Sequence, residues 1–92
     1  MKTIWKFPLE IVDRQPVSIP VGAQLLDVQM QGDQPCLWAL VDTESPRITL
    51  VVRIYGTGHE IRDDPGLYLG TFQERTLVFH VFTSMPAPRV AP

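Results

Sequence analysis

The sequence has one cysteine, no excess of positive charge and no long apolar run, and each of these absences excludes a class of protein. With Cys36 as the single cysteine among 92 residues, no disulfide can form within this chain. Eight basic and ten acidic residues give a net charge of −2, so the chain lacks the basic surface that holds a polyanion. The apolar stretches are far shorter than the ~20 residues that cross a bilayer. We therefore predict no nucleic-acid partner and no membrane partner.

The start of the chain also lacks the features of a secretion signal. Lys6, Pro8 and Glu10 interrupt any apolar segment that could serve as the core of a signal peptide. The expected location is therefore cytoplasmic. Cys36 lies in an apolar run, residues 35–41, which favours a buried and unreactive thiol.

A helical periodicity is missing as well, because apolar residues alternate with a period of two along almost the whole chain. The alternation is clear in residues 24–31, where Leu26, Val28 and Met30 share one side. Nine prolines and six glycines divide the chain into short segments. We predict strands at about residues 2–9, 15–20, 24–31, 35–42, 47–55, 67–73 and 76–82.

Turn signals between these segments indicate the architecture. Residues 31–34 and the pair Glu74-Arg75 each join two segments as a β-hairpin, and residues 56–66 form the longest loop. Parallel strands would need crossover helices, which the sequence does not offer. We predict a single all-β domain over residues 1–83, a small antiparallel sandwich or flattened barrel of about seven strands with mostly meander connections. A proline-rich tail over residues 84–92 follows it.

The closing segment is apolar on both faces, and the segment at 35–42 behaves likewise. One face of the closing segment carries Leu77, Phe79 and Val81. The other face carries Val78, His80 and Phe82. Without helices, the second face must be covered by the 56–66 loop, by the C-terminal tail or by another copy of the chain. We predict a homo-oligomeric interaction or structural module with Val78, His80 and Phe82 in the interface. Considered by itself, His80 is expected to be a core histidine hydrogen-bonded to backbone or to a tyrosine, with a pH-sensitive interface residue as the alternative.

The loop after the fifth segment carries the residues most typical of a site. Gly56 and Gly58 let backbone amides approach a ligand, and His59 can bind it or transfer protons. Asp63 and Asp64 follow closely. The pattern is neither the dinucleotide fingerprint nor a phosphate loop, because no helix follows and the required Lys and Ser or Thr are missing. A small-ligand or enzymatic site at these five residues is the alternative function, and a turn with positive φ is the structural alternative.

The other chemistry-bearing residues form no recognisable motif. His59, Asp63, Asp64 and His80 could supply metal ligands, but paired cysteines are absent, so we predict no metal and no cofactor. No serine has the sequence context of a nucleophile. No catalytic residue is therefore assigned, and enzymatic activity is not favoured.

Two further groups have structural interpretations. Arg53 is expected to form an ion pair with Glu44, Glu60 or an acid of another chain. Core packing, rather than base stacking, is expected for the aromatic side chains because the basic residues are scattered. These aromatic residues are Trp5, Phe7, Trp38, Phe72, Phe79 and Phe82.

Several segments together resemble one family of small uncharacterised proteins from bacterial and bacteriophage genomes. They are residues 1–9 (MKTIWKFPL), 19–23 (IPVGA), 35–42 (PCLWALVD), 53–59 (RIYGTGH) and 77–82 (LVFHVF). The resemblance covers most of the chain up to about Phe82 and excludes the tail after Thr83. It implies a small accessory protein of a phage or mobile element. Since the family carries no assigned activity, the resemblance transfers no catalytic residue.

Overall fold

The computed structural model describes residues 1–84, and every segment predicted to be a strand forms one there. Each observed boundary lies within two residues of the predicted one. The strands are β1 (Lys2–Pro8), β2 (Arg14–Pro20), β3 (Gln24–Gln31), β4 (Gln34–Asp42), β5 (Arg47–Gly56), β6 (Leu67–Glu74) and β7 (Leu77–Ser84). The predicted proline-rich tail falls on residues 85–92, outside the described residues. The described part of the chain has no helix long and apolar enough to cross a membrane.

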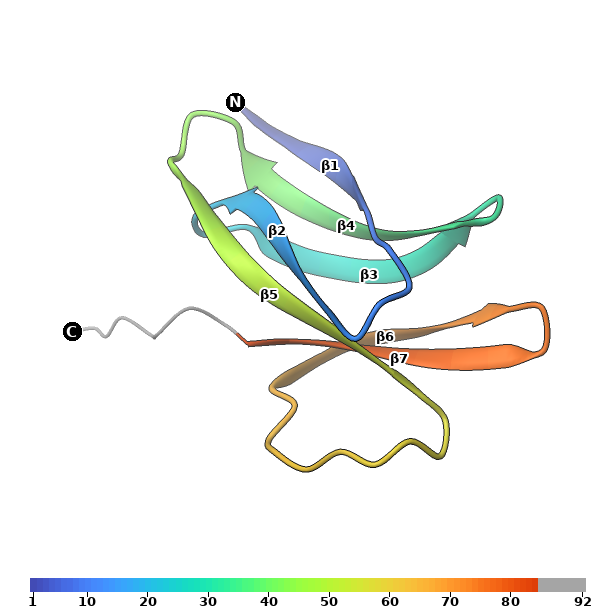
Figure 1. Cartoon of the computed structure of the whole chain (residues 1–92). Coiled ribbons are helices and arrows are strands. Elements are labelled where there is room, and N and C mark those ends of the chain that lie inside the picture. The colour runs from blue at the N-terminus through green and yellow to red at the C-terminus, as the bar shows by residue number, and fades with distance from the viewer. Residues whose placement is uncertain (85–92) are drawn as a thin grey trace.

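The strands form two separate antiparallel sheets that pack face to face (Figure 1). The smaller sheet has the order β1-β4-β3, and the larger has the order β2-β5-β7-β6. The thinnest dimension of the molecule is 16 Å, as expected for two layers ~10 Å apart. The fold is therefore the sandwich of the two predicted alternatives, and not a closed barrel.

The connections are more varied than the predicted meander. The β3–β4 and β6–β7 hairpins were both expected, and within residues 1–84 they alone join neighbouring strands of one sheet. The β1–β2, β2–β3 and β4–β5 connections pass from one sheet to the other. The β5–β6 connection passes over β7, which lies between these two strands. Hairpin signals predict only local pairing, so the sequence does not reveal these longer connections.

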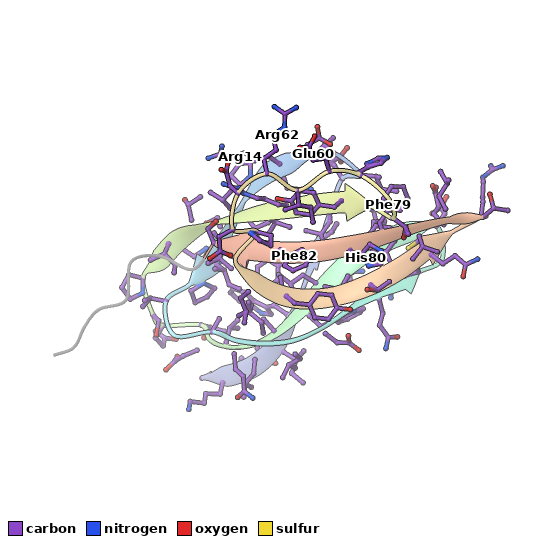
Figure 2. All side chains as sticks on the ribbon, turned by 90° about the horizontal axis from the view of Figure 1, so that it is seen from below. Arg14, Glu60, Arg62, Phe79, His80 and Phe82 are labelled. Carbon is purple, nitrogen blue, oxygen red and sulfur yellow. The ribbon has the colours of Figure 1, made fainter. Side chains whose placement is uncertain are left out.

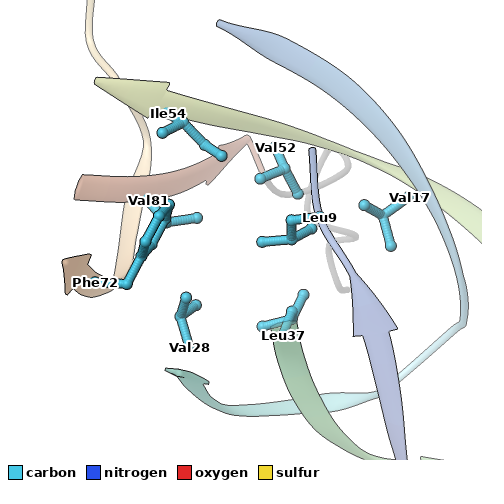
Figure 3. Close-up of a cluster of buried hydrophobic side chains, with 8 residues drawn as sticks. All are labelled: Leu9, Val17, Val28, Leu37, Val52, Ile54, Phe72 and Val81. Atoms are coloured by element: carbon cyan, nitrogen blue, oxygen red, sulfur yellow. The ribbon is translucent and has the colours of Figure 1, made fainter. Parts of the chain in front are cut away.

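The core lies between the sheets and is built from the inward-facing side chains of both (Figure 3). Leu9, in the connection between β1 and β2, is only 1% exposed, because that connection turns into the interior. The larger buried cluster contains Leu9, Val17, Val28, Leu37, Val52, Ile54, Phe72 and Val81. Ile19, Ala39, Val41 and Leu50 form a second cluster. Cys36 is fully buried, as predicted. Its neighbours on β4 face inward, so strand alternation turns Cys36 toward the outer side of the sheet.

One side of the sandwich is closed by direct packing of β3 against β6, which are edge strands of different sheets. A Cβ atom on Gly70 of β6 would stand 3.1 Å from the Cβ atom of Val28 on β3. The absence of a side chain at Gly70 therefore lets the two edges approach each other. β6 also has an irregularity in its register with β7 between Tyr68 and Gly70, which bends the strand at this point.

Candidate functional site

The outer face of the larger sheet carries the side chains that alternate with the core residues. Two rows cross β5, β7 and β6 in the strand register. One row consists of Arg53, Phe82 and Tyr68, and the other of Tyr55, His80 and Thr71. His80 and Phe82, which were predicted as interface residues, thus each sit in the middle of one row. All six side chains retain contact with solvent.

Phe82 lies edge to face between two tyrosines. Its ring centroid is 5.7 Å from that of Tyr55 and 5.4 Å from that of Tyr68, with interplanar angles of 71° and 61°. Such T-shaped contacts favour aromatic pairs beyond the area that they bury. The second apolar face of β7 is therefore covered in part by neighbouring strands of the same chain, and Phe82 is half-buried.

His80 is held between two threonine hydroxyls. Its Nε2 lies 2.7 Å from Oγ1 of Thr57, and its Nδ1 lies 3.0 Å from Oγ1 of Thr71. Thr71 Oγ1 is in turn 2.6 Å from the hydroxyl of Tyr68, and Thr57 Oγ1 donates to the carbonyl of Val78 at 3.3 Å. With Nε2 protonated, Thr57 and Thr71 each accept one hydrogen bond and donate another, and the Tyr68 hydroxyl donates to Thr71. His80 is thus hydrogen-bonded as expected, but its partners are two threonine hydroxyls and not the expected backbone or tyrosine.

The loop from Thr57 to Gly66 is anchored at both ends. The backbone amide of Thr57 donates to the carbonyl of Val78 at 3.1 Å, and the amide of His59 donates to Gly56 at 3.1 Å. At the far end Oδ1 of Asp64 accepts from the amide of Gly66 at 2.9 Å. Figure 2 shows the loop arching across this side of the larger sheet, beside the labelled His80 and Phe82 on β7.

The glycines of the loop have distinct roles. Gly58 and Gly66 have φ angles of 90° and 95°, in the left-handed region that glycine adopts without strain. Gly56 instead makes room for a side chain, because a Cβ there would stand 2.8 Å from Cε1 of His59. The His59 ring therefore lies directly on the backbone of Gly56.

The loop and the sheet border an open hollow of about 390 Å³. It is lined by Tyr55, Gly56, Thr57, Gly58, His59, Ile61, Tyr68, Thr71, His80 and Phe82. The structure thus brings three predicted loop residues, Gly56, Gly58 and His59, together with two predicted interface residues, His80 and Phe82. Asp63 and Asp64 do not line the hollow, since Asp64 holds the loop end and Asp63 is exposed. Val78 lies outside it as well, in a neighbouring depression with Leu77 and Phe79.

A second hollow of about 340 Å³ adjoins the first and shares Tyr55 and His59 with it. Arg14 and Arg53, which are cross-strand partners on β2 and β5, lie on its wall together with Asp13 and Glu60. The predicted ion pair of Arg53 does not form within residues 1–84, and its Nε is buried without a hydrogen-bond partner there. Glu60 pairs instead with Arg62 at 3.4 Å, because both lie on the exposed loop.

Apart from Phe82, the aromatic and hydroxyl residues of the hollow were not among the site residues assigned from the sequence. Tyr68 and Thr71 reach one face of β6 although they are three positions apart, because the strand bulges between them. Strict alternation would place them on opposite faces. Thr57 and Ile61 belong to the loop, whose path no periodicity predicts. Within the described residues, no three His, Cys, Asp or Glu side chains gather in a way that could hold a metal ion.

Together, the fold and the hollow define a small two-sheet antiparallel β-sandwich with a lined depression on the outside of its larger sheet. The chain belongs to the family described as Domain of unknown function (DUF7352), whose model matches residues 1–90. The match extends beyond Phe82, where the resemblance seen in the sequence ended. No curated protein and no solved structure matches the chain significantly. The family description names no activity, source or partner, so phage affiliation, compartment and self-association stay predictions.

Proposed function

We propose that this protein is a binding module that takes a small, flat ligand into the hollow between the 57–66 loop and the outer face of the larger sheet. The observation that carries the proposal is the position of Phe82, edge to face between Tyr55 and Tyr68 on the floor of that hollow. Aromatic rings with solvent contact inside a depression are the surfaces that a planar ring covers most favourably.

The size of the hollow limits the ligand. About 390 Å³ is near the lower end of the ~300–1,000 Å³ range of ligand pockets, and it suits one or two fused rings. If ligand and protein together remove about 100 Å² of apolar surface from water, the complex is stabilised by ~2.5 kcal/mol before ordering costs. One polar group of the ligand can exchange hydrogen bonds with the hydroxyls of Thr57, Thr71 and Tyr68, which all line the hollow.

Binding fits this arrangement better than catalysis. Both ring nitrogens of His80 already contact threonine hydroxyls, and the carboxylates of Asp63 and Asp64 lie outside the hollow. A general base needs a free nitrogen or carboxylate within hydrogen-bond reach of the reacting group. His59 is the one histidine of the lining that threonine hydroxyls do not hold, and no carboxylate of residues 1–84 lines the hollow beside it to orient its ring for catalysis.

The test is a titration followed by ¹H–¹⁵N NMR with indole, adenine and phenyl phosphate as probes. We expect at least one probe to shift the resonances of Tyr55, His80 and Phe82 with a dissociation constant of about 1 mM or below. Tyr68→Ala should weaken that probe, and Leu67→Ala is the matched control because both side chains are about equally exposed, at 55% and 52%. The absence of localised shifts for all three probes, or equal binding by Tyr68→Ala, would contradict the proposal.

A second candidate function is self-association as an interaction or structural accessory module, with the phage or mobile-element origin that the resemblance implies. The observation that favours it lies on the other sheet, where Ile4 and Leu26 are 57% and 44% exposed. Val78, His80 and Phe82 support it less, because the chain itself covers part of His80 and Phe82. Light scattering coupled to size exclusion at rising concentration tests it, and a monomer throughout would contradict it.

A further inference from the structure

Two arginines lie side by side on the outer face of the larger sheet without an acidic partner. Arg14 of β2 and Arg53 of β5 are directly opposite each other in the strand register. The Cβ atoms of residues paired in this way are about 5 Å apart, and like charges at such positions destabilise the sheet. No carboxylate of residues 1–84 lies within salt-bridge distance of either guanidinium. An anion between the two side chains would therefore relieve a repulsion that the fold leaves unbalanced.

Packing restricts the guanidinium of Arg53. Its Nε is buried and has no hydrogen-bond partner within residues 1–84. Its two Nη atoms make no hydrogen bond there either, and they are not buried as Nε is, so they remain open to solvent. A side chain that is already confined loses less conformational entropy when it binds a ligand. Arg53 thus presents free Nη donors at the wall of the second hollow.

The two hollows meet along residues that they share. Tyr55 and His59 line both of them. Phe82, on the floor of the first hollow, is the cross-strand partner of Arg53, which lines the second. Because neighbouring strands are ~4.8 Å apart, Phe82 and the two arginines are separated by one to two strand spacings, or ~5–10 Å. A substituent on a ring over Phe82 can therefore reach Arg53 and Arg14.

We propose that the ligand of this protein is an aromatic compound with a phosphate monoester, whose ring lies over Phe82 and whose phosphate lies between Arg14 and Arg53. The inference rests on the proposed function and adds the class of ligand to it. A phosphate monoester carries a charge of about −1.5 to −2 at pH 7 and three acceptor oxygens, which match two guanidinium groups. A carboxylate carries one charge and is satisfied by a single guanidinium fork. The pair of arginines therefore favours the phosphate.

Two carboxylates on the same wall limit the affinity. Asp13 and Glu60 line the second hollow beside the arginines. Glu60 is paired with Arg62 at 3.4 Å, and both are labelled on the loop in Figure 2, so part of its charge is balanced there. The carbonyl of Asp13 accepts from the amide of Ile54 at 3.2 Å, which keeps residue 13 beside β5. Asp13 is thus the negative charge that most directly opposes a bound phosphate.

Comparing a nucleoside with its phosphate tests the inference. Adenosine and adenosine 5′-phosphate share the same ring, and the ribose separates that ring from the phosphate. In ¹H–¹⁵N NMR titrations at low salt, we expect the phosphate to bind about tenfold more tightly than adenosine. It should shift the resonances of both Phe82 and the Nε–H group of Arg53. The advantage of the phosphate should shrink as sodium chloride is raised, because salt screens exposed charges.

Variants locate the phosphate. Arg14→Gln removes a charge from an exposed side chain and should reduce the advantage to about threefold or less, as should Arg53→Gln. Each variant is measured with both ligands, so a folding defect weakens both constants and leaves their ratio. Arg75→Gln, at the exposed β6–β7 turn outside both hollows, is the control for net charge and should keep the parent ratio. Asp13→Asn should increase the advantage by about threefold, a gain that no damage to the fold produces.

The outcomes separate this inference from the proposed function. Equal binding of adenosine and its phosphate would overturn the phosphate site and leave the first hollow standing. An advantage that survives in both Arg14→Gln and Arg53→Gln places the phosphate elsewhere and also overturns it. A ligand that shifts Arg53 but not Phe82 does the same, because its ring then lies outside the first hollow. Failure of adenosine 5′-phosphate to bind, with localised shifts from indole, refutes the ligand class alone, and no shifts from any probe removes the proposed function as well.

Discussion

The ring of His59 lies against the backbone of Gly56, so that a Cβ atom at position 56 would stand 2.8 Å from Cε1 and 3.0 Å from Nδ1 of that ring. Gly56 ends β5, and His59 lies in the loop that covers the hollow. The contact therefore connects a strand end to the wall of the candidate site.

Gly56→Ala should displace the His59 ring and change the hollow without unfolding the protein. The His59 side chain is exposed and can move, so we expect a loss of stability below ~1 kcal/mol. The His59 ring resonances in a ¹H–¹³C spectrum should shift, and probe binding should weaken. Asp63→Ala, on the exposed loop and outside the hollow, is the control and should leave the His59 resonances and probe binding unchanged. Unchanged His59 resonances in Gly56→Ala would show that the ring does not rest on this glycine.

Gly70→Ala should loosen the contact between the two sheets at their β3–β6 side. The added Cβ would stand 3.1 Å from Val28 Cβ and 3.4 Å from its backbone nitrogen, and β3 cannot yield as a flexible side chain can. We expect a loss of ~1–3 kcal/mol in the free energy of unfolding, measured with urea. In Gly70→Ala/Val28→Gly the absence of the Cβ atom at position 28 should make the combined loss smaller than the sum of the two single losses. Simple additivity of the two losses would contradict this reasoning.

Thr71→Val should destabilise the protein through His80. The substitution keeps the shape of the side chain but removes the hydroxyl that contacts both Nδ1 of His80 and the hydroxyl of Tyr68. A lost hydrogen bond of this kind costs ~0.5–1.5 kcal/mol, and Thr57→Val should cost a similar amount. Because both threonines act on one imidazole, the double variant should depart from additivity. Thr49→Val, on the exposed face of β5, is the control and should be nearly neutral in the same urea titration.

Asp42 should make stability depend on pH in the acid range. Its Oδ1 accepts a hydrogen bond from the backbone amide of Glu44 at 3.0 Å, and this bond lowers the pKa of Asp42 below its ordinary value of 3.8. A carboxylate whose pKa is lower in the folded state stabilises that state above the unfolded pKa, and the contribution disappears as pH falls through the folded pKa. Asp42→Ala should therefore lose stability at pH 7 and approach the parent at about pH 2.

Thermal unfolding of Asp42→Ala between pH 7 and about pH 2 measures this difference directly. Thr49→Ala, which removes no ionisable group from an exposed position on β5, is the control and should show no such trend. A gap between Asp42→Ala and the parent that stays constant across the pH range would mean that ionisation of Asp42 is unimportant.

The strands and both hairpins could be predicted because each depends on neighbours in the sequence. A period of two places Val52 and Ile54 on one face of β5, and a glycine at position 32 with a φ of 62° closes the β3–β4 turn. The site could be predicted only in part. His59 and Phe82 were both singled out, but for different roles, and nothing in the sequence shows that they line one hollow.

The order of apolar and polar residues alone determined that this chain folds as short antiparallel strands with an apolar side turned inward, because alternation sets which side chains share a face. It left a sandwich and a flattened barrel as alternatives. The tertiary structure decided which strands become neighbours. β5 pairs with β7, although β6 and a long loop separate them in the sequence. It also decided that the bulge in β6 aligns Tyr68 with Phe82. Pairing between distant segments depends on packing summed over both sheets, which no local pattern encodes.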